Sequence, residues 1–136
     1  MSSCGIDRIT RKPLYGWAHV LQSVDVIFET VIGDRVMHRD FGGGMRRMLG
    51  RKLTPDILAL AAALFGLSIT IWEPRLRVVK TSIAPSAEEI RQGVVSFVMT
   101  VAYRPRGHLG DPTEELAYIG VGINEAGTLA TMPIAT

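Results

Sequence analysis

The sequence predicts an α+β protein in which N-terminal helices, with a long buried central helix among them, pack on a small antiparallel sheet. Two observations predict this class. Apolar residues repeat at helical spacing in the first half of the chain and alternate with polar residues in the last third. The helical segments come before the strands, and short links join the strands in sequence, which favours an antiparallel meander.

The 136 residues are predicted to form one domain spanning residues 1–136, with residues 1–16 as an extended N-terminal arm and residues 124–136 as an extended C-terminal tail. The net charge of +2 is too small to indicate a nucleic-acid partner by itself. Cys4 is the one cysteine, which excludes an internal disulfide framework. Charges occupy the N-terminal positions where a secretory signal would need an apolar run, so we expect no such signal.

The first helix is predicted over residues 18–31. Gly33 is expected to end it, because glycine adopts the left-handed conformation that closes many helices. Polar residues such as Gln22 and Asp25 fall on the opposite, solvated side. Five apolar residues share one helical face: Val20, Val24, Ile27, Phe28 and Val31.

A basic stretch follows the first helix, with six lysines and arginines against two acids over residues 34–52. A short helix over residues 45–49 is predicted after the three consecutive glycines at 42–44. The stretch fits a solvated surface paired with acids, and it also fits a contact with protein or nucleic acid. The composition leaves both interpretations open.

The second helix begins with a strong start signal. Thr54 can cap it, Pro55 suits the first helical position, and Asp56 favours the positive helix end. The helix must stop before Pro74, because proline disfavours helical geometry at the preceding residue. It is apolar nearly all round, which predicts burial in the centre of the fold. The uncharged run over residues 57–72 is short for a membrane span, so no membrane is expected.

The last third predicts three strands, over residues 75–83, 94–103 and 115–123. The second strand is the clearest, because apolar residues alternate strictly with small or polar ones. Gly120 and Gly122 weaken the third strand. The connections between the strands are rich in proline, glycine and charge, as exposed loops are.

Converging catalytic groups are not evident in the sequence, so no catalytic residue, cofactor or metal is predicted. Asp25 and Glu29 share one helix face, and a glycosidase also uses two carboxylates, but such a pair is usually plain solvation of a polar face. The histidines are scattered without metal-ligand spacing and are expected to be surface or capping residues: His19, His38 and His108.

Glu73, Pro74 and Arg75 stand at the junction between the second helix and the first strand of the last third. One interpretation is a helix stop with surface charges. The other rests on geometry, since proline stiffens the backbone and residues two apart in an extended segment point to one side. Glu73 and Arg75 would then form a preset acceptor–donor pair able to bind a partner.

Several stretches occur in a distinctive order: GIDR near the start, LQSV in the first helix, then GDRVMHRDFG, WEPR and LRVV. In this order the sequence resembles the small baseplate wedge protein, or sheath initiator, of contractile phage tails. Subunits of type VI secretion baseplates and contractile bacteriocins are related to that family. The resemblance covers residues 5–79 well and the strand region by pattern. Gly43 and Gly44 depart from the small polar and bulkier apolar residues that the family often has there.

The resemblance implies a structural, non-enzymatic subunit of the virion tail baseplate, present in the host cytoplasm during assembly. It implies that Glu73, Pro74 and Arg75 bind the core bundle formed by the larger wedge subunits. It also implies that the β region nucleates the sheath by accepting extended arms of tail sheath subunits. Central hub or tube proteins are further candidate partners, and nucleic acid is not expected.

Two expectations about the isolated subunit follow. The strand Glu115–Ile123 is the expected docking edge, because an open edge can pair with a strand of another chain. Glu73→Ala and Arg75→Ala are expected to leave the fold intact, since an exposed ion pair contributes only ~0–1 kcal/mol. The alternatives to the baseplate function are a lysozyme-like cell-wall glycan hydrolase and a small nucleic-acid-binding protein that uses residues 35–52.

Overall fold

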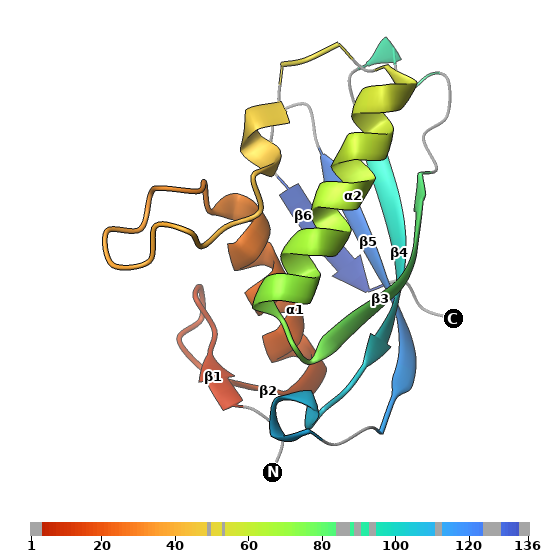
Figure 1. Ribbon diagram of the computed structural model, residues 1–136. Helices are drawn as coiled ribbons and strands as arrows, with labels where there is room; N and C mark the ends of the chain where they lie inside the picture. The colour runs from red at the N-terminus through yellow and green to blue at the C-terminus, as the bar shows by residue number, and fades with distance from the viewer. Residues whose placement is uncertain are drawn as a thin grey trace.

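The computed structural model describes residues 4–48, 50–52, 54–83, 88, 91, 92, 95–110, 113–123 and 129–133. It has two long helices, a terminal hairpin and a four-stranded sheet (Figure 1). The elements in chain order are β1 (Cys4–Ile6), β2 (Pro13–Tyr15), α1 (Gly16–Glu29), η1 (Met45–Met48), α2 (Pro55–Trp72), β3 (Leu76–Ile83), β4 (Val95–Tyr103), η2 (Gly107–Leu109), β5 (Glu115–Ile123) and β6 (Leu129–Pro133). The predicted α+β class is confirmed.

The main sheet is antiparallel with the strand order β3-β4-β5-β6. Strand β5 pairs with β4 along its whole length and with β6 on its other side. The prediction that Glu115–Ile123 is an open docking edge is therefore wrong for its second half, because β6 pairs with Ile119–Ile123. Within the described strands the edges are β3, β6 and the first half of β5, and β3 carries an irregularity between Val78 and Lys80.

Helix α1 starts and ends slightly earlier than predicted. Thr30 lies at its C-terminal end, where the Thr30 backbone N–H and hydroxyl both donate to the Val26 carbonyl, at 3.1 and 2.6 Å. Gly33, the predicted stop, has a φ of 103° and lies further along the loop. The predicted apolar face is confirmed for four residues, all fully or almost fully buried: Val20, Val24, Ile27 and Phe28.

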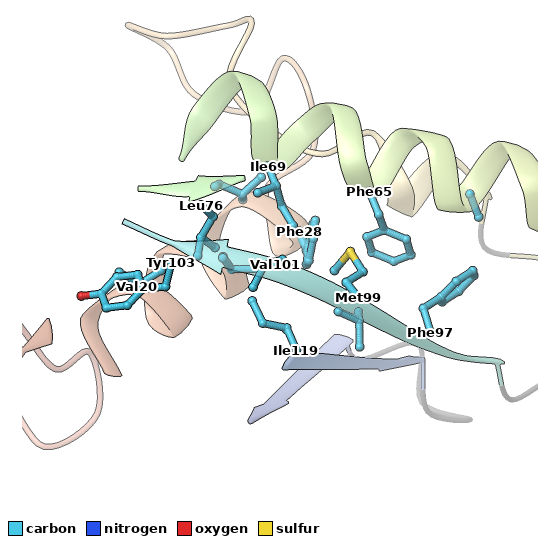
Figure 2. Packing of buried hydrophobic residues seen from close by; sticks show 14 residues of the cluster. Val20, Phe28, Phe65, Ile69, Leu76, Phe97, Met99, Val101, Tyr103 and Ile119 are labelled. Atoms are coloured by element: carbon cyan, nitrogen blue, oxygen red, sulfur yellow. The ribbon is translucent and has the colours of Figure 1, made fainter. Parts of the chain in front are cut away.

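The core lies between the two helices and one face of the sheet (Figure 2). The Phe65 ring of α2 meets the Phe28 ring of α1 edge to face, with the ring centroids 4.7 Å apart. The Phe97 ring of β4 lies 4.9 Å from the same Phe65 ring. Met99 and Ile119 face each other across β4 and β5 and are both fully buried. Phe65 therefore joins the two helices to the sheet.

Helix α2 begins as predicted, with the Thr54 hydroxyl accepting a hydrogen bond from the Ile57 backbone N–H at 3.4 Å. Its predicted burial holds for one face only, because Leu60, Leu67 and Ile71 are about half exposed. By length and composition alone the helix could cross a membrane, with a mean hydropathy of 1.7 and 22% of its residues buried. In this fold it packs its other face on the sheet and on α1.

The N-terminal segment forms a hairpin from β1 and β2, which lies against α1. Gln22 fastens it, because its side chain donates to the Ile6 carbonyl at 3.0 Å and accepts from the Arg8 backbone N–H at 3.2 Å. Arg8 also forms an ion pair with Glu29, at 2.9 Å. Of the C-terminal tail, residues 129–133 form β6, and residues 124–128 and 134–136 lie outside the described residues.

Candidate functional site

The segment Glu73, Pro74 and Arg75, called the corner below, joins α2 to β3 in a tight turn. The Glu73 backbone N–H donates to Ile69 and closes the helix at 2.8 Å. The Glu73 carbonyl then accepts from the Leu76 backbone N–H at 3.0 Å, which closes the turn. Pro74 is exposed at its tip. Proline thus ends the helix as predicted and directs the chain at once into the edge strand.

The side chains of Glu73 and Arg75 form a bidentate ion pair inside the chain. Arg75 Nε lies 2.6 Å from Glu73 Oε1, and Arg75 Nη2 lies 2.6 Å from Oε2. The Arg75 backbone N–H also points at Oε1, at 3.4 Å. Glu73 is 2% exposed and Arg75 is 9% exposed. Both charged groups are thus removed from water and hydrogen-bond to each other. A planar guanidinium binds a carboxylate most strongly in this bidentate geometry.

Helix α1 supplies two further polar partners to this pair. Arg75 Nη1 lies 3.0 Å from His19 Nδ1. Because a guanidinium can only donate, His19 Nδ1 accepts and must be unprotonated there. Ser23, one helical turn after His19, hydrogen-bonds to the Glu73 carboxylate. The ion pair therefore ties the end of α2 to the first half of α1.

The surroundings move the pKa values of these groups. Burial acts to raise the pKa of Glu73, but hydrogen bonds from Arg75 and Ser23 and the Arg75 charge outweigh it, so the pKa lies below the ordinary 4.5. Burial, and then the Arg75 charge, hold the pKa of His19 below its ordinary 6.5, against the smaller opposing effect of Glu73. The folded protein thus favours a charged Glu73 and a neutral His19.

Two glycines allow other segments to approach the corner closely. A Cβ on Gly5 would lie 2.3 Å from the His19 ring, so the β1 backbone can pack on this ring only without a side chain. A Cβ on Gly107 would lie 2.7 Å from the Pro74 carbonyl oxygen. The loop after β4 is held there by a hydrogen bond from the Arg104 backbone N–H to the Arg75 carbonyl, at 2.8 Å.

Glu73 and Arg75 do pair with each other, as one of the two interpretations of the sequence expected, and their binding to a partner stays a prediction. The expectation that alanine variants leave the isolated fold unaffected rested on an exposed pair, and the burial of both side chains removes that basis. His19 was expected at the surface or at a helix end, and it lies in the first turn of α1, half-buried, as a partner of Arg75. The four-residue spacing of His19 and Ser23, which places both on one helix face, was the available signal.

The other candidate groups lie apart from the corner. Glu29, one of the two acids on the α1 face, pairs with Arg8 rather than facing a second carboxylate across a cleft. In the basic stretch, the Arg35 guanidinium lies 3.9 Å from the centroid of the Phe41 ring. His38 packs against Trp72. Within the described part of the chain, no three of the His, Cys, Asp and Glu residues are grouped as metal ligands would be.

The His19 contact predicts a pH dependence of stability. Because the pKa of His19 is lower in the folded state, the unfolded chain binds more protons between that lowered value and pH 6.5. The contribution of His19 is therefore complete above pH 6.5 and is lost as the pH falls through the folded pKa. Urea unfolding of the wild type should show this loss between pH 8 and pH 5, and His19→Gln should lack it. If the free energy of unfolding depends on pH equally in the wild type and in His19→Gln, this role for His19 is ruled out.

Comparison with known proteins identifies the family. Residues 16–107 match the family described as Baseplate wedge protein gp25. The chain belongs to this family. Baseplate protein W of Escherichia phage P2 is 33% identical over 83 residues, a stretch that covers 60% of this chain and 71% of the phage protein. As a member of the family, the chain is a structural wedge subunit of contractile tails, located in the tail baseplate.

Solved structures of two contractile baseplates contain similar chains. A chain of the postcontracted pyocin R2 baseplate superposes with a TM-score of 0.63 at 27% identity, covering 75% of this chain and 99% of that one. A chain of the anti-feeding prophage baseplate gives 0.59 at 28% identity, covering 72% and 78%. A Geobacter sulfurreducens protein described as a tail lysozyme gives 0.54 at 24% identity, covering 75% and 86%, which shows a shared fold alone.

Proposed function

We propose that this wedge subunit docks on the core bundle of the larger wedge subunits through the corner Glu73, Pro74 and Arg75. The observation that supports this most is the contrast within the corner, where a buried, bidentate ion pair holds an exposed proline at a rigid turn. A preorganised contact loses little conformational entropy on binding. The ion pair acts as an internal brace, and the exposed Pro74 with the adjacent backbone meets the partner.

This division of roles separates docking from stability in an experiment. Pro74→Asp places a charge at the centre of the proposed contact and should reduce co-purification with the larger wedge subunits by about tenfold or more. The isolated variant should lose about 1 kcal/mol of stability or less, since Pro74 is exposed and loses mainly the stiffness of its ring. Pro13→Asp makes the same change at an exposed proline of the terminal hairpin and should assemble normally. Normal assembly of Pro74→Asp would contradict docking through the corner.

Sheath nucleation at a sheet edge is the second part of the proposal. An edge strand presents unpaired backbone groups that an extended arm of a sheath subunit can pair with. Strand β3 carries a bulge and the exposed Lys80, two features that protect an edge from pairing. Strand β6 pairs with β5 without a register shift, and its sequence carries no charged residue. This difference from β3 favours β6 as the strand that receives the sheath arm. A sheath strand beside β3 instead of β6 in assembled particles would contradict the choice.

The proposed role is non-catalytic. A glycoside hydrolase of the lysozyme type needs a carboxylic acid whose pKa is raised so that it can protonate the leaving group. Glu73 has the opposite property, because its pKa is lowered and its two oxygens are occupied by Arg75. Clearing of a peptidoglycan suspension by the purified chain would contradict the proposal.

A further inference from the structure

The loop over residues 31–41, called the tip loop below, connects α1 to the segment before η1. It contains most of the GDRVMHRDFG stretch, to which the proposed function assigns no role. In Figure 1 it is the orange loop that stands away from the helices and the sheet. Val36 is 79% exposed and Met37 is 96% exposed. Single exposed apolar residues are common on protein surfaces, so the exposure alone decides nothing.

The backbone of the tip loop is closed on itself by hydrogen bonds. The Gly33 N–H donates to the Arg39 carbonyl at 2.8 Å and joins the two ends of the loop. Within this closure, the His38 N–H donates to the Arg35 carbonyl at 3.4 Å, across the tip residues Val36 and Met37. The two apolar side chains are thus presented on a closed turn.

Aromatic packing fixes the base of the tip loop to the body of the protein. The Phe41 ring lies 5.0 Å from the Trp72 ring, and the His38 ring lies 5.5 Å from it. Arg35 covers the Phe41 ring with its guanidinium. Aromatic pairs and cation–π contacts stabilise a structure beyond the burial of apolar area, so these contacts favour one orientation of the loop. The tip loop is therefore held in a defined orientation and ends in apolar side chains.

The anchor of the tip loop adjoins the corner. Trp72 is the last residue of α2 and immediately precedes Glu73. Because His38 and Phe41 pack on Trp72, the loop and the corner lie at the same end of α2. A partner that reaches Pro74 is therefore close to the base of the loop, and one binding surface can include both.

We propose that the tip loop is a second contact of the wedge interface, inserting Val36 and Met37 into an apolar pocket of a partner protein. This rests on the proposed docking at the corner. Few interface residues carry most of the binding free energy, and these sit in desolvated pockets. Methionine adapts its shape to such a pocket. Arg35 and Arg39 flank the tip, so the rim of the pocket is expected to carry carboxylates.

The chemistry of the loop favours a protein partner over a membrane or a nucleic acid. Asp34 and Asp40 flank the tip beside the arginines, and an anionic lipid surface or a phosphate backbone would repel these carboxylates. The side chains of Val36 and Met37 are also apolar and have no donor or positive charge that could bind a phosphate. A protein pocket can match the apolar end and both charge signs at its rim.

The test compares Met37→Asp with Ile9→Asp. Ile9 is 90% exposed at the tip of the terminal hairpin, so it offers the same change at an exposed apolar residue elsewhere. Met37→Asp should keep the wild-type melting temperature and reduce co-purification with the larger wedge subunits by about tenfold or more. Ile9→Asp should behave as wild type. A photoreactive residue in place of Met37 should cross-link to a larger wedge subunit in purified particles.

The remaining outcomes separate this inference from the proposed function. If Pro74→Asp fails to dock while Met37→Asp docks normally, the tip loop is not a contact, and docking at the corner still holds. If both variants dock normally, both proposals are overturned. Binding of the wild type, but not of Met37→Asp, to phosphatidylglycerol vesicles or to a DNA column, with unchanged wedge co-purification, would assign the loop to a membrane or nucleic-acid partner and overturn the inference.

Discussion

Arg75→Ala should lower the free energy of unfolding of the isolated subunit by about 3–5 kcal/mol, because it leaves a buried carboxylate without its cation. Glu73 is 2% exposed, so water cannot replace the two lost hydrogen bonds without a rearrangement. The same change also removes the donor to His19 and the link between α1 and the end of α2. Urea unfolding at pH 7 measures the effect.

Arg77→Ala is the matched control for this prediction. Arg77 is an arginine two positions further along the chain, and its ion pair with Glu114 is longer, at 3.4 Å, and much more exposed. Its loss should cost only ~0–1 kcal/mol. A small effect of Arg75→Ala, close to that of Arg77→Ala, would show that the corner is not an internal brace.

The pH dependence of the Arg75→Ala effect provides a second check. The pKa of Glu73 is lowered in the folded wild type, so this group stabilises the fold above pH 4.5, and the contribution is lost as the pH falls through the folded pKa. In Arg75→Ala the cation that lowers this pKa is absent. The stability difference between the two proteins should therefore narrow below pH 4.5. A constant difference would indicate lost packing rather than lost charge pairing.

Phe65→Ala should cost about 3–5 kcal/mol, the range for removing a fully buried aromatic side chain. Its ring contacts Phe28 and Phe97, so the cavity would open where α1, α2 and the sheet meet. Leu67→Ala, two positions along the same helix, should cost about 1 kcal/mol or less, because Leu67 is 55% exposed. If urea unfolding shows that Phe65→Ala and Leu67→Ala lower the free energy of unfolding by similar amounts, α2 is buried all round, as its sequence alone suggests.

Local patterns predicted most of the secondary structure. The Thr54 cap, the Pro55 start and the stop before Pro74 define α2, because each acts through the backbone of its own neighbours. Strict alternation likewise predicted β4. The hairpin and β6 escaped prediction, because short strands depend on a partner strand that the local sequence does not reveal. The exposed face of α2 escaped it as well, since composition cannot show which apolar face a neighbour covers.

The sequence could predict only the part of the candidate site that comes from neighbouring residues of the chain. Glu73 and Arg75 are two residues apart around a proline, and this spacing offered their pairing as one of two interpretations. His19, Ser23 and Gly107 join the site from distant parts of the chain. Only the packing of α1 and of the loop after β4 against the corner brings them there. Whether a charge pair is buried or exposed likewise depends on these non-local neighbours.

A density map of the assembled baseplate would show whether the corner meets the larger wedge subunits. We expect the exposed face of Pro74 to contact the helices of these subunits. We also expect Glu73 and Arg75 to remain paired with each other inside this chain, as they are here. A map in which the corner faces solvent, or in which Arg75 leaves Glu73 to bind a carboxylate of another chain, would contradict docking through a braced corner.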